Sequence, residues 1–269
     1  MTDFSVLTWA DVLAAAVFFA AWIGYGPAVR RFSGGRGVNA DMAAVRMRWM
    51  RHMALRREGR LIDGQLIGHI LNSASFFASS NLILIAATAG VLFGGDSAYR
   101  NLRGLPLVAH ATRLLFTLKI TLVTAALARS LLDFIWAIRQ LNYCIALVGA
   151  APDDVADNRL MRYADTCGRV FNHALSTFNS GVRGYYFALA AAAWVLGPAA
   201  LAGATLGAVA LLGFRQLASP TARNIRRARE LLEEGEAEAA QAGPAPVRAQ
   251  AASTPTPIGQ VTPVPPIPQ

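Results

Sequence analysis

The sequence predicts an all-α integral membrane protein with four to five transmembrane helices and additional cytoplasmic amphipathic helices. Of its 269 residues, 54% are hydrophobic and 15% are charged, whereas soluble domains carry about one quarter charged residues. The apolar residues also lie in long uncharged blocks separated by arginine-rich stretches, which is typical of membrane proteins. These observations argue against a soluble enzyme.

The positive charge is concentrated in one block. The net charge is +9, and Lys119 is the single lysine beside 24 arginines. Nine of these arginines fall in residues 30–60, and none falls in residues 1–29. Because cytoplasmic loops of membrane proteins are rich in Lys and Arg, we expect the N-terminus outside and residues 30–65 in the cytoplasm. No nucleic-acid-binding motif accompanies the charge, so nucleic acid is not a predicted partner.

The first two predicted spans cover residues 7–29 and 66–93. The first contains the uncharged stretch Val12–Val29, which as a helix is about 27 Å long. Acidic residues precede it and arginines follow it, which is the reverse of a cleavable signal peptide. The second span has a first half rich in Ser and Asn, which we expect to be buried against neighbouring helices.

The third predicted span, 114–138, carries three charged residues: Lys119, Arg129 and Asp133. A charge inside a span costs about 2.5–3.5 kcal/mol on insertion scales, so these residues are candidates for a functional site. Arg129 and Asp133 lie four positions apart and are predicted to form an ion pair within the helix. Lys119 is too distant to join that pair, and we expect it to extend outward to the membrane surface.

The last apolar run, Gly184–Phe214, is interrupted by Gly197-Pro198. It is either one kinked helix or a hairpin of two spans, 177–196 and 199–217. The hairpin returns the arginines that follow to the cytoplasm, so it is the preferred interpretation. The membrane domain is then 1–218, followed by a charged cytoplasmic helix at 219–241 and a disordered Pro-rich tail at 242–269.

Two cytoplasmic helices are predicted between the spans. Residues 39–60 form the first, with Asn39 as its N-cap. Either Arg48, Trp49 and Arg51 contact anionic lipid headgroups, with Trp49 at headgroup level, or this helix packs on the bundle with a solvated basic face. The second covers about residues 160–178, with an apolar stripe that seals the cytoplasmic end of the bundle.

Polar and aromatic residues gather at the predicted cytoplasmic boundary of the third and fourth spans. They are Trp136, Arg139, Asn142, Tyr143, Arg183 and Tyr185. They form either a cluster that binds a lipid headgroup or small anion, or the ordinary aromatic belt of a membrane protein. Cys144 and Cys167 have neither CxxC spacing nor paired histidines, so no metal or cofactor is predicted.

Several short strings together resemble the bacterial branch of domain-of-unknown-function family 599. The strings are Arg48-Trp49-Met50, Asp63-Gly64-Gln65, residues 76–80 (FFASS), residues 134–143 (FIWAIRQLNY), residues 149–152 (GAAP), Phe171-Asn172 and residues 181–190 (GVRGYYFALA). The resemblance covers about residues 5–225 and implies a multi-span protein of the bacterial inner membrane with no assigned activity.

The functional prediction is correspondingly general. No phosphate loop, GxSxG elbow or HExxH helix is present, so an enzyme is not predicted. We expect an inner-membrane protein with a structural or regulatory role through lipid or protein contacts, the partner being the bilayer, another membrane protein or a second copy. The alternative is a small transporter or channel that uses the charges of the third span.

Overall fold

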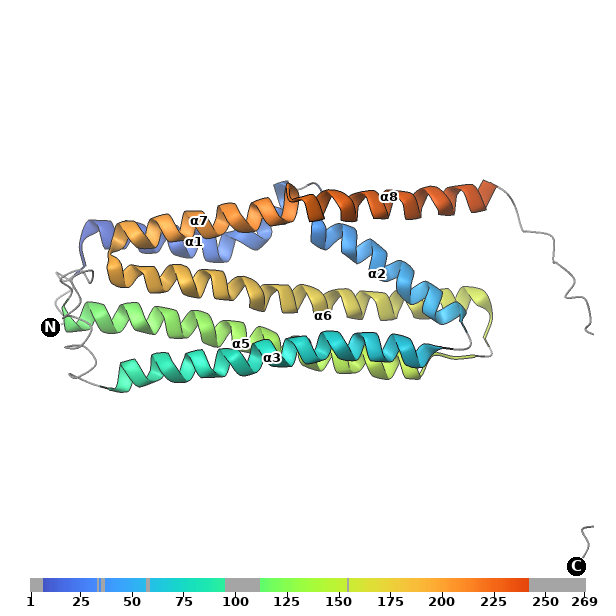
Figure 1. The fold of residues 1–269 in the computed structure, drawn as a ribbon, viewed down its shortest axis with the longest axis horizontal. Helices are drawn as coiled ribbons and strands as arrows, with labels where there is room; N and C mark the ends of the chain where they lie inside the picture. Colours follow the sequence, from blue (N-terminus) through green and yellow to red (C-terminus); the bar gives the residue numbers. More distant parts are fainter. Residues whose placement is uncertain are drawn as a thin grey trace, which may run out of the picture. The chain divides into compact units, whose positions relative to one another are not determined.

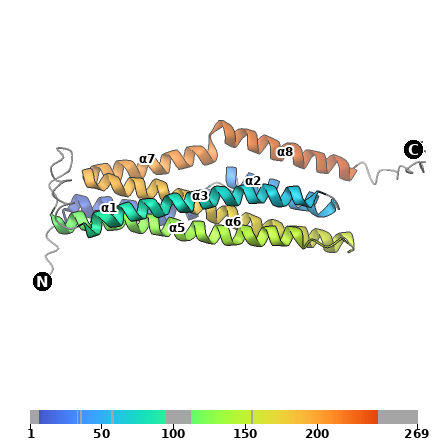
Figure 2. The ribbon, with the colours of Figure 1, turned by 60° about the horizontal axis from the view of Figure 1, so that its bottom comes forward.

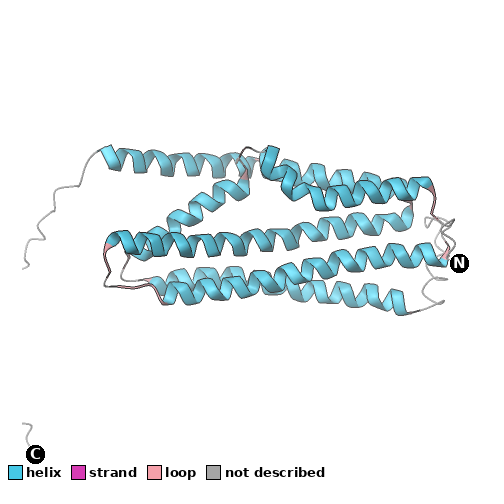
Figure 3. Ribbon diagram, turned by 180° about the vertical axis from the view of Figure 1, so that it is seen from behind, coloured by secondary structure: helices cyan, strands magenta, loops and turns pink. Residues whose placement is uncertain are grey.

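The computed structural model describes residues 7–32, 34, 37–56, 59–94, 112–153 and 155–241, and these residues are almost entirely helical (Figure 3). In chain order the helices are α1 (Trp9–Phe32), α2 (Val38–Leu55), α3 (Arg60–Phe93), α5 (Arg113–Gly149), α6 (Asp157–Ala192), the short 3₁₀ helix η2 (Ala193–Leu196), α7 (Pro198–Leu217) and α8 (Pro220–Gln241). The all-α prediction is confirmed. The predicted tail, 242–269, lies outside the described residues.

Residues up to Glu230 form one compact unit. In this unit α3, α5 and α6 run side by side over most of their lengths, α1 and α7 lie next to each other, and α2 crosses α6 (Figures 1 and 2). At about 1.5 Å per residue, α1 and α7 match the roughly 30 Å of a bilayer core, whereas α3, α5 and α6 extend well beyond it.

Within the described part of the chain, four stretches are long and apolar enough to cross a membrane by length and composition: Trp9–Val29, Arg60–Phe93, Arg113–Gly149 and Pro198–Glu238. The predicted span 177–196 is not among them. It falls in the second half of α6 and in η2, where polar residues such as Asn179 and Arg183 lower the hydropathy. That the stretch 177–196 crosses the membrane as a fourth span therefore stays a prediction.

The chain reverses at Gly197, between η2 and α7. Gly197 has a φ of 135°, a conformation that residues with a side chain rarely adopt, and Pro198 is the first residue of α7, where proline is well tolerated. Helix α7 then packs back on α6. Of the two interpretations of this run, the structure has the hairpin and not the single kinked helix.

In the described residues the apolar core has two large parts, one at each end of the α5–α6 pair, and a small third cluster around Ala54, Leu160 and Ala164. The first lies between α1, α5, α6 and α7, around Phe18, Leu127 and Phe187. The second lies between α2, α3, α5 and α6, around Met50, Leu141 and Phe171. The second part shows what α2 does, because Met50 and Met53 of this helix are buried against the long helices.

Three local predictions are wrong. Asn39 is not an N-cap, because α2 begins at Val38 with Gly37 (φ 128°) before it. That helix also ends at Leu55, since Arg56 is extended (φ −81°, ψ 125°). The polar first half of α3 is not buried: His69, Asn72, Ser73 and Ser79 are exposed, and Asn81 is the exception among these polar residues. The reason is that this part of α3 packs on its neighbours through one face only, which contains Ile67 and Ala74, so the polar residues on the other faces stay exposed.

The second cytoplasmic helix and the fourth span are one element. The apolar stripe from Leu160 to Phe178 continues without a break into residues 181–192, so that α6 is 36 residues long. The helix begins at Asp157, slightly before the predicted range.

Candidate functional site: a basic pocket between α1, α2 and α6

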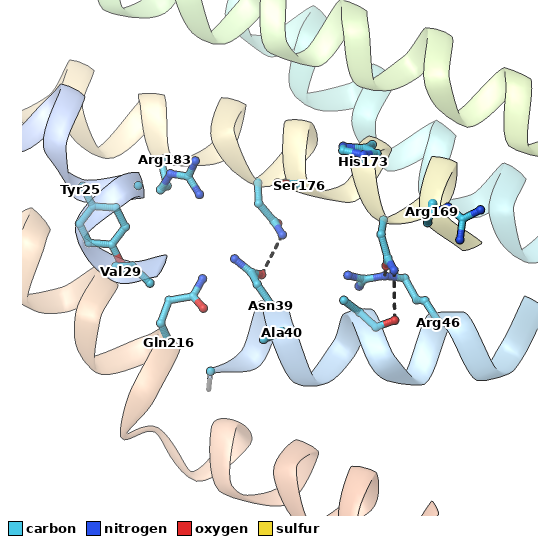
Figure 4. A pocket seen from close by; sticks show the side chains of 15 residues that line it. Tyr25, Val29, Asn39, Ala40, Arg46, Arg169, His173, Ser176, Arg183 and Gln216 are labelled. Carbon is cyan, nitrogen blue, oxygen red and sulfur yellow. Dashed lines mark hydrogen bonds between the residues drawn. The ribbon is translucent and has the colours of Figure 1, made fainter. Parts of the chain in front are cut away.

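A pocket of about 420 Å³ lies where α1, α2, α6 and the end of α7 meet (Figure 4). We call it the basic pocket. Its polar lining residues are Arg46, Arg169 and Arg183, Asn39, Asn172 and Asn179, and His173, Ser176, Gln216 and Tyr25. Pockets of this size commonly hold small ligands, and the three arginines give this one a positive charge.

Side-chain hydrogen bonds between α2 and α6 fix the walls of the pocket. Arg46 donates from Nε to Asn172 Oδ1 (2.7 Å), and Asn172 donates in turn to the carbonyl of Ala43 (3.1 Å). Two helical turns further along α6, Asn179 donates to Asn39 Oδ1 (3.0 Å). Figure 4 shows Asn39 and Arg46 reaching from α2 toward α6. The pocket is thus held open by polar contacts that leave part of each side chain facing the cavity.

The charge of the pocket is not neutralised by its own lining. No Asp or Glu is among the described residues that line it, and no ion pair to Arg46 occurs in the described part of the chain. Burial lowers the pKa of the Arg46 guanidinium to about 10, because desolvation disfavours the charged form. Arg46 nevertheless stays cationic at neutral pH, and an anion beside it would restore its pKa.

Tyr25 supplies the second unusual group. The side chain is 7% exposed, lines the pocket and belongs to α1. Its hydroxyl is buried and has no hydrogen-bond partner among the described residues. A buried hydroxyl without a partner costs about 1–3 kcal/mol, so a ligand atom that accepts or donates at this position would recover that free energy.

A second cavity, of about 460 Å³, continues from the basic pocket along the bundle. We call it the lateral groove, and it runs between α1 and α5 with α6 as its floor. The two share Gly26 and Arg183. Arg129 and Asp133 line the groove and form the predicted ion pair, at 3.0 Å between Arg129 Nη1 and Asp133 Oδ1.

Lys119 does not extend outward as predicted. It is 2% exposed and sits with Nζ 5.8 Å from the centre of the Trp194 ring. The indole of Trp194 donates to Asp11 Oδ1 (2.8 Å), and Thr8 donates to Asp11 Oδ2 (2.6 Å). The reason is that η2 and the start of α1 close over this end of α5 and bury a lysine near a carboxylate.

The structure divides the predicted boundary cluster into separate groups. Trp136, Arg139, Asn142 and Tyr143 are exposed on the outer face of α5, with Arg139 donating to the Tyr143 hydroxyl (3.2 Å). Arg183 instead lies in the basic pocket and in the lateral groove. Tyr185 donates to the carbonyl of Phe77 (2.8 Å). Helical spacing places residues on a face, but these residues belong to different faces of two packed helices.

The predicted lipid-contact residues are also divided. Trp49 faces the bundle: its indole donates to Asp63 Oδ1 (2.7 Å), and its ring meets Phe171 edge-on at 5.4 Å. This placement disagrees with a position at headgroup level. Arg51 pairs with Asp165 (2.7 Å), and Arg48 is near His52 on the outer side of α2. Contact of these two arginines with lipid stays a prediction.

Most residues of the basic pocket were not predicted from the sequence. Asn39 and Arg46 are seven positions apart on α2, and Asn172 and Asn179 are seven apart on α6. A spacing of seven places residues on one helix face two turns apart. The sequence signal for the pocket was therefore a pair of polar residues two turns apart on each of the helices α2 and α6. The spacing does not show that these two pairs of polar residues face each other.

The described residues hold no group of three or more His, Cys, Asp or Glu side chains able to bind a metal ion. In comparisons with known proteins, neither a curated protein nor a solved structure matched the chain. One family model matched, described as "Protein of unknown function, DUF599", over residues 13–221. The resemblance to this family is thereby confirmed, while its bacterial branch stays a prediction, and the chain belongs to the DUF599 family of proteins of unknown function.

Proposed function

We propose that this membrane protein binds a phosphate-type anion in the basic pocket and exerts a regulatory role through that contact, without catalysing a reaction. The observation that carries the proposal is the buried, unpartnered hydroxyl of Tyr25 in a pocket with three arginines and no carboxylate. Guanidinium groups bind phosphate strongly because they are planar donors with fixed charge. A phosphoryl oxygen near Tyr25 would satisfy both features.

Topology supports a cytoplasmic opening. The arginine-rich block at residues 30–60 includes α2, which forms one wall of the pocket, and such blocks stay on the cytoplasmic side. The pocket then lies at the cytoplasmic boundary of an inner-membrane protein. Both the phosphate of an anionic lipid and a soluble phosphate reach that depth.

The test is a comparison of Arg46→Gln with Arg48→Gln. The full chain in dodecyl maltoside is titrated with inorganic phosphate, with chloride at equal ionic strength as reference, and the unfolding temperature is measured. We expect phosphate to stabilise the wild type and Arg48→Gln alike. Arg46→Gln should weaken phosphate binding by about tenfold or more, since a hydrogen bond to a charged group contributes about 1.5–3 kcal/mol.

The control arginine is well matched. Arg48 lies two positions away on the same helix and does not line the pocket, so both variants remove one charge from α2. Equal phosphate affinity in the two variants, or equal effects of phosphate and chloride on the wild type, would contradict the proposal.

A second candidate function is solute transport, and one observation favours it. Charged side chains lie along the bundle at two depths, Lys119 beside Asp11 at one end and Arg129 with Asp133 in the lateral groove. Such residues in spans often mark solute or ion pathways. The first core, with Phe18 and Phe187 in edge-to-face contact at 6.0 Å, separates the two depths.

The transport candidate is tested with proteoliposomes and radiolabelled phosphate. If Asp133 serves a pathway, Asp133→Asn should leave the unfolding temperature unchanged and remove the flux. The double variant Arg129→Leu with Asp133→Leu removes the ion pair without leaving a lone charge. Full folding and full flux in this double variant would show that the pair is structural.

A further inference from the structure

The lateral groove gives the basic pocket a second opening. The basic pocket and the groove share Arg183 and Gly26, so a group bound at Arg183 can be reached from both. From Arg183 the groove continues toward Arg129 and Phe19, beside stretches of α1 and α5 that are apolar enough to cross a membrane. One end of the combined site is therefore polar, and the other is next to the bilayer.

The walls of the groove are amphipathic. On the α1 side the rim residues Phe19 and Ile23 are 42% and 72% exposed. The floor on α6 contains Ser180, Gly184 and the buried ring of Phe187. Apolar rim residues that face outward beside an apolar floor form a surface suited to an acyl chain.

The charges of the groove favour an anionic ligand over a neutral one. The lining contains two guanidinium groups, Arg129 and Arg183, and one carboxylate, Asp133. The Arg129 side chain is 59% exposed although it lies in a membrane-spanning helix. Asp133 compensates the charge of Arg129 through their ion pair at 3.0 Å, so the lining of the groove keeps a net charge of +1, and an anionic headgroup beside it would lower the cost of that charge in the membrane.

We infer that the ligand of the basic pocket is carried by the membrane: an anionic phospholipid whose phosphate lies between Arg183 and Arg46 and whose acyl chain occupies the lateral groove. The inference rests on the proposed function and adds the source of the phosphate. The lipid enters sideways between α1 and α5, and its headgroup points toward the cytoplasmic opening.

The experiment compares a groove variant with a matched control. Ser180→Phe places a ring on the floor of the groove and leaves every lining residue of the basic pocket in place, whereas Ser79→Phe adds the same ring on the exposed side of α3. The full chain is titrated in dodecyl maltoside with inorganic phosphate, with soluble dihexanoyl phosphatidylglycerol and with dioleoyl phosphatidylglycerol.

We expect Ser79→Phe to behave as the wild type with all three probes. Ser180→Phe should bind inorganic phosphate normally and dioleoyl phosphatidylglycerol at least about tenfold more weakly, since each buried methylene contributes about 0.8 kcal/mol. Ser180→Phe should weaken binding of the short-chain lipid less than binding of the long-chain lipid. Dioleoyl phosphatidylcholine, which has the same tails and no net charge, should bind the wild type more weakly than the glycerol lipid.

A second pair of variants keeps the test valid if the added ring prevents folding. Ile23→Ser changes an exposed rim residue, and Leu13→Ser makes a comparable change on the exposed part of α1 outside the groove, where Leu13 is 66% exposed. We expect Ile23→Ser alone to weaken binding of the long-chain lipid.

The outcomes separate the two proposals. If phosphate binding depends on Arg46 but neither groove variant changes the affinity for the long-chain lipid relative to its control, the ligand is a soluble phosphate and the inference is wrong. If phosphate binding does not distinguish Arg46→Gln from Arg48→Gln, the proposed function itself fails.

Discussion

At the scale of single residues, two glycines set the separation of α5 and α6. A Cβ built on Gly184 would lie 1.7 Å from Ser130 Oγ, and one built on Gly181 would lie 2.7 Å from the Phe134 ring. Ser130 uses this proximity to donate to the carbonyl of Gly181 (3.1 Å). Small residues that allow close helix packing and an interhelical hydrogen bond are typical of membrane bundles.

Gly184→Ala should therefore destabilise the protein. The new methyl group displaces the Ser130 hydroxyl and with it the hydrogen bond to Gly181, and overpacking of this kind costs about 1–3 kcal/mol. Gly207→Ala on α7 is the control, because a Cβ there meets nothing within 4 Å. We expect thermal unfolding in detergent to show a clear drop for Gly184→Ala and no drop for Gly207→Ala. Equal unfolding temperatures would show that α5 and α6 separate without penalty.

Cys167 is a buried thiol at the α2-facing end of α6, with 2% exposure. Burial raises its pKa, so the reactive thiolate is scarcer at neutral pH than for an exposed cysteine. In a Cys144→Ser background, we expect labelling of native Cys167 by iodoacetamide to be at least tenfold slower than labelling of a cysteine introduced at exposed Arg162. The difference should vanish on unfolding. Fast labelling of the native protein at pH 7 would contradict the buried position.

Two charged groups of α5 show which contacts helical spacing can predict. The Arg129–Asp133 pair was predictable because four positions on one helix fix its geometry. The burial of Lys119 was not, because the groups that enclose it, Trp194 and Asp11, come from the two ends of the chain's membrane domain. A side chain's surroundings depend on which helices are neighbours, and helical spacing within one segment does not contain that information.

At the scale of elements, α2 and α8 are joined through one buried carboxylate. Asp41 is 2% exposed, with Oδ1 3.1 Å from Arg229 Nη1 and Oδ2 3.8 Å from Arg226 Nε. The start of α2 is next to the basic pocket, where Asn39 and Ala40 belong to its lining. The first turns of α8 are thus attached to the helix that forms a wall of the site.

Asp41→Asn should loosen this attachment. Removal of the negative charge leaves two arginines near a buried amide, and breaking a buried ion pair commonly costs about 3–5 kcal/mol. We expect trypsin to cleave the native variant after Arg226, Arg227 or Arg229 several-fold faster than the wild type. Asp165→Asn is the control, because the pair of Asp165 with Arg51 is half-exposed and such pairs contribute at most about 1 kcal/mol. Equal rates of cleavage in both variants would show that Asp41 does not hold α8 on α2.

Sequence patterns identified the helices but misjudged where some of them end. Residues 160–178 and the fourth span were predicted as separate elements but form one helix, because the apolar stripe of α6 keeps its helical period while it passes from one part of the core to the other. By contrast, Gly197-Pro198 does end a helix, as its conformational preferences require. A strong local signal such as Gly197-Pro198 therefore predicted a helix end correctly. The apolar stripe of α6 gave no sign in the sequence of the point at which it passes from one part of the core to the other.

At the scale of the whole membrane unit, the basic pocket is a product of tertiary packing. Its two cross-links join residues 126 and 140 positions apart, Arg46 with Asn172 and Asn39 with Asn179. Neither α2 nor α6 is unusual alone. The sequence could predict a basic cytoplasmic side, but the pocket required the observation that α2 lies across α6 with its asparagine and arginine facing inward.

The directions in which the helices run predict a membrane topology that can be tested. Asp11 at the start of α1 contacts Trp194 at the end of the α6–η2 segment, and Gly37 just after α1 is close to Gln216 at the end of α7. Helices α1 and α7 are therefore parallel, α6 runs opposite to both, and the start of α1 and the end of α7 are at opposite ends of the bundle. Helix α7 then carries the chain to the side of the arginine-rich block.

A reporter fused after Leu217 should therefore be cytoplasmic, and one fused before Trp9 should be outside. The physical reason is that residues 30–60 hold nine arginines, and translocating them would oppose the charge bias that orients membrane helices. Paired alkaline phosphatase and fluorescent-protein fusions measure both positions, and a fusion within α2 provides the internal reference. A periplasmic signal after Leu217 together with a cytoplasmic signal from α2 would require α7 not to cross the membrane, and the basic pocket would lose one of its walls.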